Sequence, residues 1–194
     1  MSIYNIGKGI CMIIYHVLFR IKVSGKEHVP QNGPVIICTN HISNFDPPLV
    51  GITSKRPVSF MAKAELFEKP ILGKLMFKIR AFPVKRGLSD RKALKSGLKL
   101  LKDDQVMGLF PEGRRSKDGE IGKALAGAGF FALRSDATVI PCRIIGPYKL
   151  FGKIHVIYGK PVNMDELKNQ KASPQEAADL IMDDIRNLSI DKAV

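Results

Sequence analysis

Thr39-Asn40-His41-Ile42-Ser43-Asn44-Phe45-Asp46-Pro47-Pro48 starts at the last residue of an apolar run. This run, Val35 to Thr39, is typical of a buried strand. Within this stretch His41 and Asp46 stand five residues apart. An imidazole accepts a proton near neutral pH, and a carboxylate within reach fixes its tautomer and stabilises the imidazolium. The pair is therefore a candidate general base, although a histidine at a strand end is more commonly a loop residue bonded to backbone.

Two further polar clusters also lie at the ends of apolar runs. They are Ala81-Phe82-Pro83-Val84-Lys85-Arg86-Gly87 and Phe110-Pro111-Glu112-Gly113-Arg114-Arg115-Ser116. Because ligands gather beyond the strand ends of α/β sheets, we expect His41, Arg86 and Glu112 to share one site.

Short apolar runs alternate with segments of helical periodicity, which is typical of an α/β domain. The 194 residues fit one domain, and no internal repeat or linker divides them. The predicted strands are Val35 to Thr39, Val58 to Ala62, Ala81 to Lys85, Gln105 to Phe110, Thr138 to Ile144 and Ile154 to Tyr158. The predicted helices include Ala64 to Ile79, Ser89 to Lys102, Gly127 to Arg134 and Pro174 to Leu188.

The N-terminal segment indicates contact with a membrane. Ile10 to Phe19 is apolar apart from His16, and as a helix it would be about 15 Å long, half the thickness of a bilayer core. The basic Arg20-Ile21-Lys22 follows instead of a small-residue cleavage site. We expect an amphipathic helix lying in one leaflet and a monotopic or peripheral protein on the cytoplasmic face of the cell membrane. The alternative is a terminal helix packed on the domain's own core.

The positive charge is concentrated in one part of the chain. The formal net charge is +13, and residues 55–102 carry 14 lysines and arginines against three acidic residues. Such a segment attracts a nucleic acid, an anionic membrane surface or an acidic carrier protein. It lacks the interleaved aromatic residues that stack on bases, so we expect no nucleic-acid partner.

The cysteines and histidines show no metal-binding pattern. Cys11, Cys38 and Cys142 lie within apolar runs and are interpreted as buried free thiols in a reducing compartment. A nucleophilic role for Cys38, three residues before His41, is a minor alternative. The four histidines are scattered without ligand spacing, so we expect no metal and no cofactor.

In these motifs the chain from about Ile21 to Pro161 resembles the glycerolipid acyltransferases, most closely the bacterial 1-acylglycerol-3-phosphate acyltransferases. Asn40-His41 with Asp46 resembles the family's Asn-His-x4-Asp motif. The family's second, third and fourth motifs are matched in this chain by Phe82 to Arg86, Phe110 to Ser116 and Val139-Ile140-Pro141. Two departures are visible. Arg114 replaces the family's usual threonine, and Lys123-Ala124-Leu125-Ala126-Gly127 replaces a Lys-Pro-Gly-like segment.

The resemblance implies a single α/β domain with a central mixed sheet flanked by helices. It divides the chain into a membrane-associating helix (1–20), a catalytic core (21–161) and a C-terminal helical extension packed on the core (162–194). It also implies transfer of a fatty acyl group from an acyl carrier protein or coenzyme A to the sn-2 hydroxyl of 1-acylglycerol 3-phosphate (lysophosphatidic acid). The product would be phosphatidic acid for phospholipid biosynthesis.

The resemblance also assigns residues to roles. His41 and Asp46 would be catalytic. The substrate-binding residues would be Arg86, Glu112, Gly113, Arg115, Lys85, Asn40, Arg114 and Lys123. Guanidinium groups suit a bidentate grip on the acceptor phosphate. An apolar groove for the acyl chain would involve Met61, Leu66, Phe67, Ile71, Leu72, Leu75 and Met76, unless these residues form the core.

Three alternatives stay open at this point. The enzyme could acylate glycerol 3-phosphate or another lysophospholipid. It could use the same base on water as a thioester or phosphate hydrolase. It could also be a non-catalytic module that binds membranes or polyanions through its basic segment.

Overall fold

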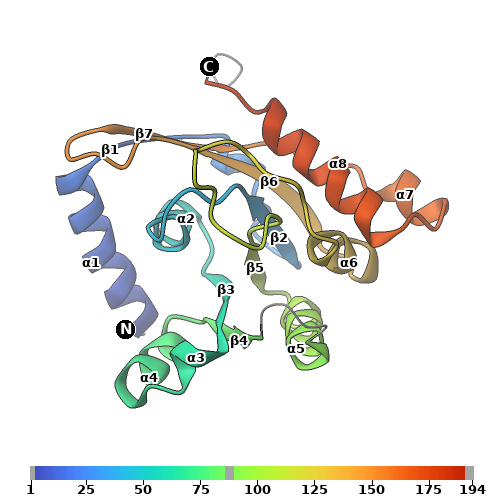
Figure 1. Cartoon of the computed structure of the whole chain (residues 1–194), viewed down its shortest axis with the longest axis horizontal. Coiled ribbons are helices and arrows are strands. Elements are labelled where there is room, and N and C mark those ends of the chain that lie inside the picture. Colours follow the sequence, from blue (N-terminus) through green and yellow to red (C-terminus); the bar gives the residue numbers. More distant parts are fainter. Residues whose placement is uncertain (1–2, 86–89, 191–194) are drawn as a thin grey trace.

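The computed structural model describes residues 3–85 and 90–190, which form one mixed sheet flanked by helices (Figure 1). The seven strands are ordered β1-β7-β6-β2-β5-β3-β4 across the sheet. Their bounds are β1 Arg20–Ser24, β2 Val35–Thr39, β3 Val58–Lys63, β4 Phe82–Val84, β5 Val106–Leu109, β6 Thr138–Ile145 and β7 Lys153–Tyr158. Neighbouring strands are parallel except for β6 and β7, which are antiparallel. The expected mixed sheet is thus confirmed.

Nine helical segments connect the strands within the described residues. They are α1 Ile3–Leu18, the 3₁₀ turn η1 Lys26–His28, α2 Asp46–Thr53, α3 Ala64–Phe67, α4 Pro70–Lys78, α5 Arg91–Lys102, α6 Gly127–Arg134, α7 Asp165–Asn169 and α8 Pro174–Asn187. The prediction of one helix from Ala64 to Ile79 was wrong. Lys69 is extended before Pro70, because proline disfavours helical backbone in the residue before it, and the chain forms two short helices instead.

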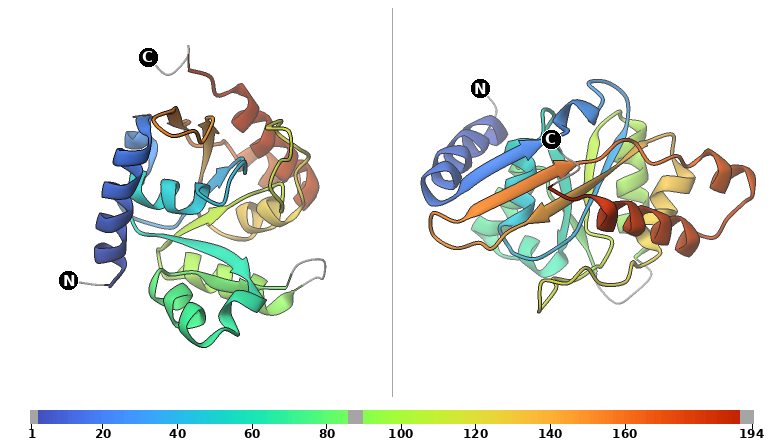
Figure 2. Two further views of the ribbon diagram at one scale, coloured as in Figure 1. Left: turned by 60° about the vertical axis from the view of Figure 1, so that its left-hand side comes forward. Right: turned by 90° about the horizontal axis from the view of Figure 1, so that it is seen from above.

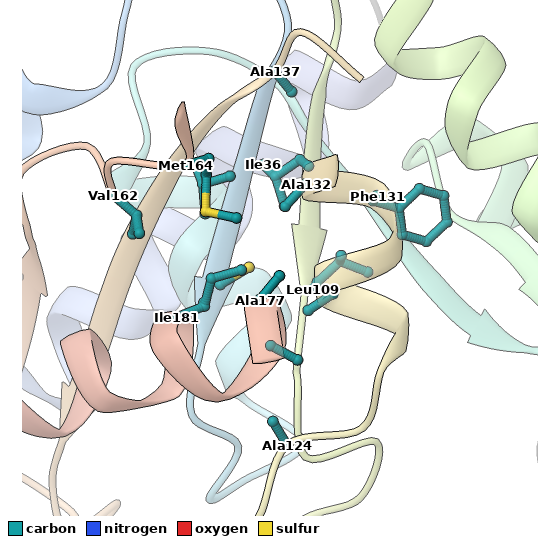
Figure 3. Packing of buried hydrophobic residues seen from close by; sticks show 14 of the residues in the cluster. Ile36, Leu109, Ala124, Phe131, Ala132, Ala137, Val162, Met164, Ala177 and Ile181 are labelled. Atoms are coloured by element: carbon teal, nitrogen blue, oxygen red, sulfur yellow. The ribbon is translucent and has the colours of Figure 1, made fainter. Parts of the chain in front are cut away.

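Both faces of the sheet are covered, which explains the continuous apolar character of β2. Ile36 and Cys38 point into a core shared with α5, α6 and α8, whereas Val35 and Ile37 point into a core shared with α1 and α2. Figure 2 shows these helices on opposite sides of the sheet, and Figure 3 shows the first core between the sheet, α6 and α8. The alternation follows from the two-residue repeat of a strand.

Strand β1 was not predicted. The Arg20–Ser24 segment pairs in parallel with β7, more than 130 residues later, at the edge of the sheet. Arg20 and Lys22 were interpreted as evidence against a cleavage site, and a strand partner so distant leaves no local signal in the sequence.

Helix α1 is attached to the domain through one side only. Tyr15 is buried, Tyr4 Oη accepts a hydrogen bond from the Val58 amide, and Lys8 Nζ donates to the Ser54 carbonyl. The other side of the helix exposes large apolar side chains at Ile3, Ile6, Ile10, Met12, Ile13, Ile14 and Val17. None of the helices in the described residues is both long enough and apolar enough to cross a membrane.

Candidate active site

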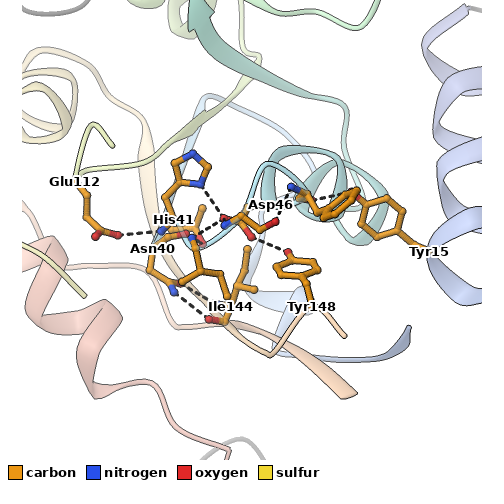
Figure 4. Close-up of polar contacts among 11 residues, drawn as sticks. Tyr15, Asn40, His41, Asp46, Glu112, Ile144 and Tyr148 are labelled. Carbon is orange, nitrogen blue, oxygen red and sulfur yellow. Dashed lines mark hydrogen bonds and ion pairs between the residues drawn. The ribbon is translucent and has the colours of Figure 1, made fainter. Parts of the chain in front are cut away.

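The turn between β2 and α2 brings His41 and Asp46 into direct contact. Nδ1 of His41 lies 2.7 Å from Oδ2 of Asp46, and the same oxygen accepts the backbone amides of Ile42 and Ser43, also at 2.7 Å (Figure 4). Asp46 is fully buried at the first turn of α2, where the helix dipole favours a negative charge. Three donors converge on one carboxylate oxygen, so the carboxylate and the loop fix each other.

This geometry sets the chemistry of the imidazole. A carboxylate accepts from Nδ1–H, which leaves Nε2 of the neutral ring as the proton acceptor. The ring stacks on Phe110, with 4.0 Å between ring centroids, and His41 is 8% exposed. The imidazole is therefore held in one orientation while it lines an open cleft.

A fourth donor to Asp46 comes from the loop after β6 and reaches the other carboxylate oxygen. The hydroxyl of Tyr148 donates to Oδ1 of Asp46 at 2.6 Å. Burial, followed by the nearby Asp46 charge, raises the pKa of Tyr148 well above its ordinary value, so the phenol stays protonated. Sequence reasoning missed this residue, because its position 102 residues after Asp46 is visible only in the fold.

Tyr148 also belongs to an aromatic cluster, which we define as Tyr15, Phe19, Phe45 and Tyr148. The rings contact one another with centroids 5.5–6.1 Å apart, mostly edge to face. The hydroxyl of Tyr15 donates to the carbonyl of Phe45, the residue directly before Asp46. The aromatic cluster thereby joins the end of the N-terminal helix to the loop that carries His41 and Asp46.

Glu112 holds the same loop from the other side. Its Oε1 accepts the His41 amide at 2.9 Å, and its Oε2 accepts the Gly122 amide at 3.0 Å. Glu112 is 7% exposed. Gly113 has a φ of 66°, which favours glycine, and an added Cβ would meet the Leu125 side chain at 2.4 Å. Glu112 thus lies beside His41, and Gly113 lies at the cleft wall.

Asn40 points away from the cleft toward β6. Its Nδ2 donates to the Ile144 carbonyl at 2.9 Å, and its Oδ1 accepts the Ile144 amide at 2.7 Å. This two-way pairing satisfies the amide and fixes the backbone immediately before His41. The geometry assigns Asn40 to positioning of the loop.

The cationic candidates lie around this centre. Lys85 lines the cleft together with His41. Arg114, Arg115 and Lys123 are exposed on the loop after β5, outside the cleft lining. Arg86 falls outside the described residues.

The cleft beside His41 has a volume of about 570 Å³ and a mostly apolar wall. The side chains that line it include Met61, Leu94, Leu109, Phe110, Leu125, Phe130 and Phe131. Of the residues expected to line an acyl groove, only Met61 is among them. The others belong to the two short helices on either side of the break before Pro70, α3 and α4, where Ile71 is 87% exposed.

The two buried cysteines lie away from the cleft. Burial raises the pKa of Cys38 and of Cys142 to about 12, so both thiols are neutral at physiological pH, and Cys38 points into the core rather than toward His41. Within residues 3–85 and 90–190, no group of three histidine, cysteine or acidic side chains could hold a metal ion.

A family model described as "Acyltransferase" matches residues 20–145, about two thirds of the chain. The chain belongs to the acyltransferase family. A Bacillus subtilis (strain 168) protein named 1-acyl-sn-glycerol-3-phosphate acyltransferase is 30% identical to this acyltransferase over 164 residues, 81% of each sequence. A Borreliella burgdorferi protein of the same name is 24% identical over 176 residues, 86% of this chain and 70% of the relative.

The fold is also shared with a solved structure. The 1-acyl-sn-glycerophosphate (LPA) acyltransferase PlsC from Thermotoga maritima matches with a TM-score of 0.76 at 19% identity, covering 97% of this chain and 81% of that protein. The family expected from the motifs is therefore confirmed, and so is the fold class.

Proposed function

We propose that this acyltransferase moves a fatty acyl group from a thioester to the sn-2 hydroxyl of 1-acylglycerol 3-phosphate and forms phosphatidic acid. The observation that carries the proposal is the buried His41–Asp46 pair facing an apolar cleft. The names of the Bacillus and Borreliella relatives support the choice of acceptor.

In the proposed reaction the acceptor alcohol is the nucleophile. Nε2 of His41 takes the hydroxyl proton while the oxygen attacks the thioester carbonyl, and Asp46 stabilises the imidazolium. The tetrahedral intermediate collapses with loss of the thiolate, which recovers the proton from His41. General base catalysis of this kind contributes about 10²–10⁴-fold to the rate, so positioning of the two substrates supplies much of the rest.

Five cationic residues are proposed to bind the acceptor phosphate: Arg86, Arg114, Arg115, Lys85 and Lys123. Lys85 has the best structural support among the described residues, because it lines the same cleft as His41. The proposed role of Glu112, Gly113 and Asn40 in substrate binding is indirect: they fix the loops beside His41 that shape the site. The apolar wall between Met61 and Phe131 receives the acyl chain, since burial of each methylene contributes about 0.8 kcal/mol.

We also propose that the protein lies on the cytoplasmic face of an anionic membrane. The exposed apolar side of α1 continues into α4, because Ile3, Ile71 and Leu75 line one shallow groove together with Lys74 and Lys78. Exposed apolar residues next to lysines are typical of helices that lie at a lipid interface. This orientation would let a lipid acceptor reach the enzyme without leaving the bilayer.

The test supplies one acyl thioester and a series of acceptors to the full chain in detergent. The acceptors are lysophosphatidate, glycerol 3-phosphate and a zwitterionic lysophospholipid, and the products are identified by mass. We expect phosphatidate with the new ester at sn-2. Acylation of another acceptor, without acylation of lysophosphatidate, would show that the proposed acceptor is wrong. Consumption of the thioester with release of free fatty acid would show that the enzyme is a hydrolase.

A further inference from the structure

Helix α5 presents a row of cations that the proposed chemistry does not use. Arg91, Lys92, Lys95, Lys99 and Lys102 are all exposed on its outer side. None of the ion pairs found in the described part of the chain involves this helix, and its acidic neighbours lie only beyond its ends, at Asp90, Asp103 and Asp104. We call the five basic residues the α5 basic face. It is a positive surface without an internal counter-charge.

The inner side of the same helix forms the wall of the catalytic cleft. Ala93 and Leu94 line the cleft with His41, and Leu101 packs in the core beneath the sheet. One helix thus has its inner side on the cleft that would hold the acyl chain and its outer side in solvent. A partner docked on the outer side would lie one helix diameter, roughly 10 Å, from the cleft.

Resting on the function proposed above, we infer that the α5 basic face docks an acidic acyl-carrier protein that delivers the acyl thioester. Opposite charges on two surfaces speed and orient such an encounter, and like charges strongly disfavour it. The basic residues from Lys92 to Lys102 extend over about 15 Å of helix, a length that suits a protein surface better than a single phosphate group.

The same face differs from the surface proposed for membrane contact. The exposed large apolar residues on α1 and α4 have no counterpart between residues 90 and 124 of the described chain. A helix that lies in lipid needs an exposed apolar side, and the apolar side of α5 faces the core and the cleft instead. The two substrates would therefore arrive by separate surfaces, the lipid acceptor from the α1 side and the carrier from the α5 side.

The test compares two donors, acyl-carrier protein and acyl-coenzyme A, carrying the same fatty acid. The variant is Lys95→Glu with Lys99→Glu, and the control is Lys160→Glu with Lys171→Glu, which makes the same charge change at exposed sites away from α5. We expect kcat/KM with acyl-carrier protein to fall about tenfold or more in the α5 variant and to stay unchanged in the control. Activity with acyl-coenzyme A should stay within about twofold in both, which also shows that the variant folds.

Several results would overturn the proposal. An equal loss with both donors would make the lysines part of the cleft, and no loss with either would remove any docking role. If the wild type is active with acyl-coenzyme A and inactive with acyl-carrier protein, the carrier is excluded as the donor while the proposed function stays intact. Inactivity of the wild type with both donors would contradict the proposed function itself. Loss of binding to anionic vesicles without loss of carrier turnover would assign the face to the membrane.

Discussion

Tyr148 donates a 2.6 Å hydrogen bond to Oδ1 of Asp46, while His41 and two backbone amides occupy Oδ2 of the same carboxylate. The tyrosine therefore shares the negative charge on which His41 depends in its proposed role as general base. It also belongs to the aromatic cluster that packs the end of α1 against the loop between β2 and α2.

We predict that Tyr148→Phe shifts the pH dependence of the reaction. Without the phenol, more negative charge remains on Asp46 and the imidazolium is stabilised, so the rising limb of kcat/KM moves to higher pH. Tyr158→Phe is the matched control, because it removes a buried hydroxyl bonded to Thr53 instead. Both variants should lose about 1 kcal/mol of stability, and an unshifted profile in Tyr148→Phe would reduce Tyr148 to a packing residue.

Asp46→Asn keeps the shape of the carboxylate but removes its charge. The amide leaves the imidazolium unsupported and presents an NH₂ group to donors that need an acceptor, so we expect kcat to fall by about 10³-fold or more. Asp183→Asn, at an exposed pair with Arg186, should leave the rate unchanged. Steady-state kinetics with saturating acceptor measure the effect. Retention of more than a tenth of wild-type kcat would contradict the assigned role of Asp46.

Glu112→Gln separates loop support from direct substrate contact. One of the two backbone amides, at His41 or Gly122, would face an NH₂ group, so we expect a loss of about 1–3 kcal/mol in the free energy of unfolding and a lower kcat. The KM for the acceptor should change little. Exposed Glu120→Gln is the control, and a selective rise in acceptor KM at normal stability would instead place Glu112 on the substrate.

The buried thiols predict a loss of stability in alkali. Burial raises the pKa of Cys38 and Cys142 to about 12 from an ordinary value of 9.0, so the folded state retains thiol protons that the unfolded chain releases. The contribution of these two thiols to the free energy of unfolding is complete below about pH 9 and is lost as the pH rises toward about 12. Urea unfolding at about pH 8 and about pH 10.5 should show a smaller fall for the Cys38→Ala, Cys142→Ala double variant than for the wild type. Equal falls would contradict the prediction.

The parts of the fold and site that could be predicted have local signals. β2 is a continuous apolar run because both its faces are buried, and His41 and Asp46 follow it within one turn. The parts that were missed depend on distant contacts. β1 pairs with a strand far along the chain, and Tyr148 reaches Asp46 only through the packing of the β6–β7 loop.

The cleft beside His41 shows why residue type alone does not locate a binding surface. The apolar residues from Leu66 to Met76 have helical spacing, but the chain breaks before Pro70 into two short helices, and none of these residues lines the cleft. Leu94 and Phe130, which do line the cleft, belong to two helices that the sequence predicted without assigning them to the site.

The most direct test of the central claim is the rate of phosphatidate formation by His41→Ala beside the wild type, at equal concentrations of folded protein. If Nε2 of His41 takes the proton from the acceptor hydroxyl, kcat should fall by about 10²–10⁴-fold, with little change in KM. A rate within threefold of the wild type would contradict the account, because the acceptor would then be activated by another group.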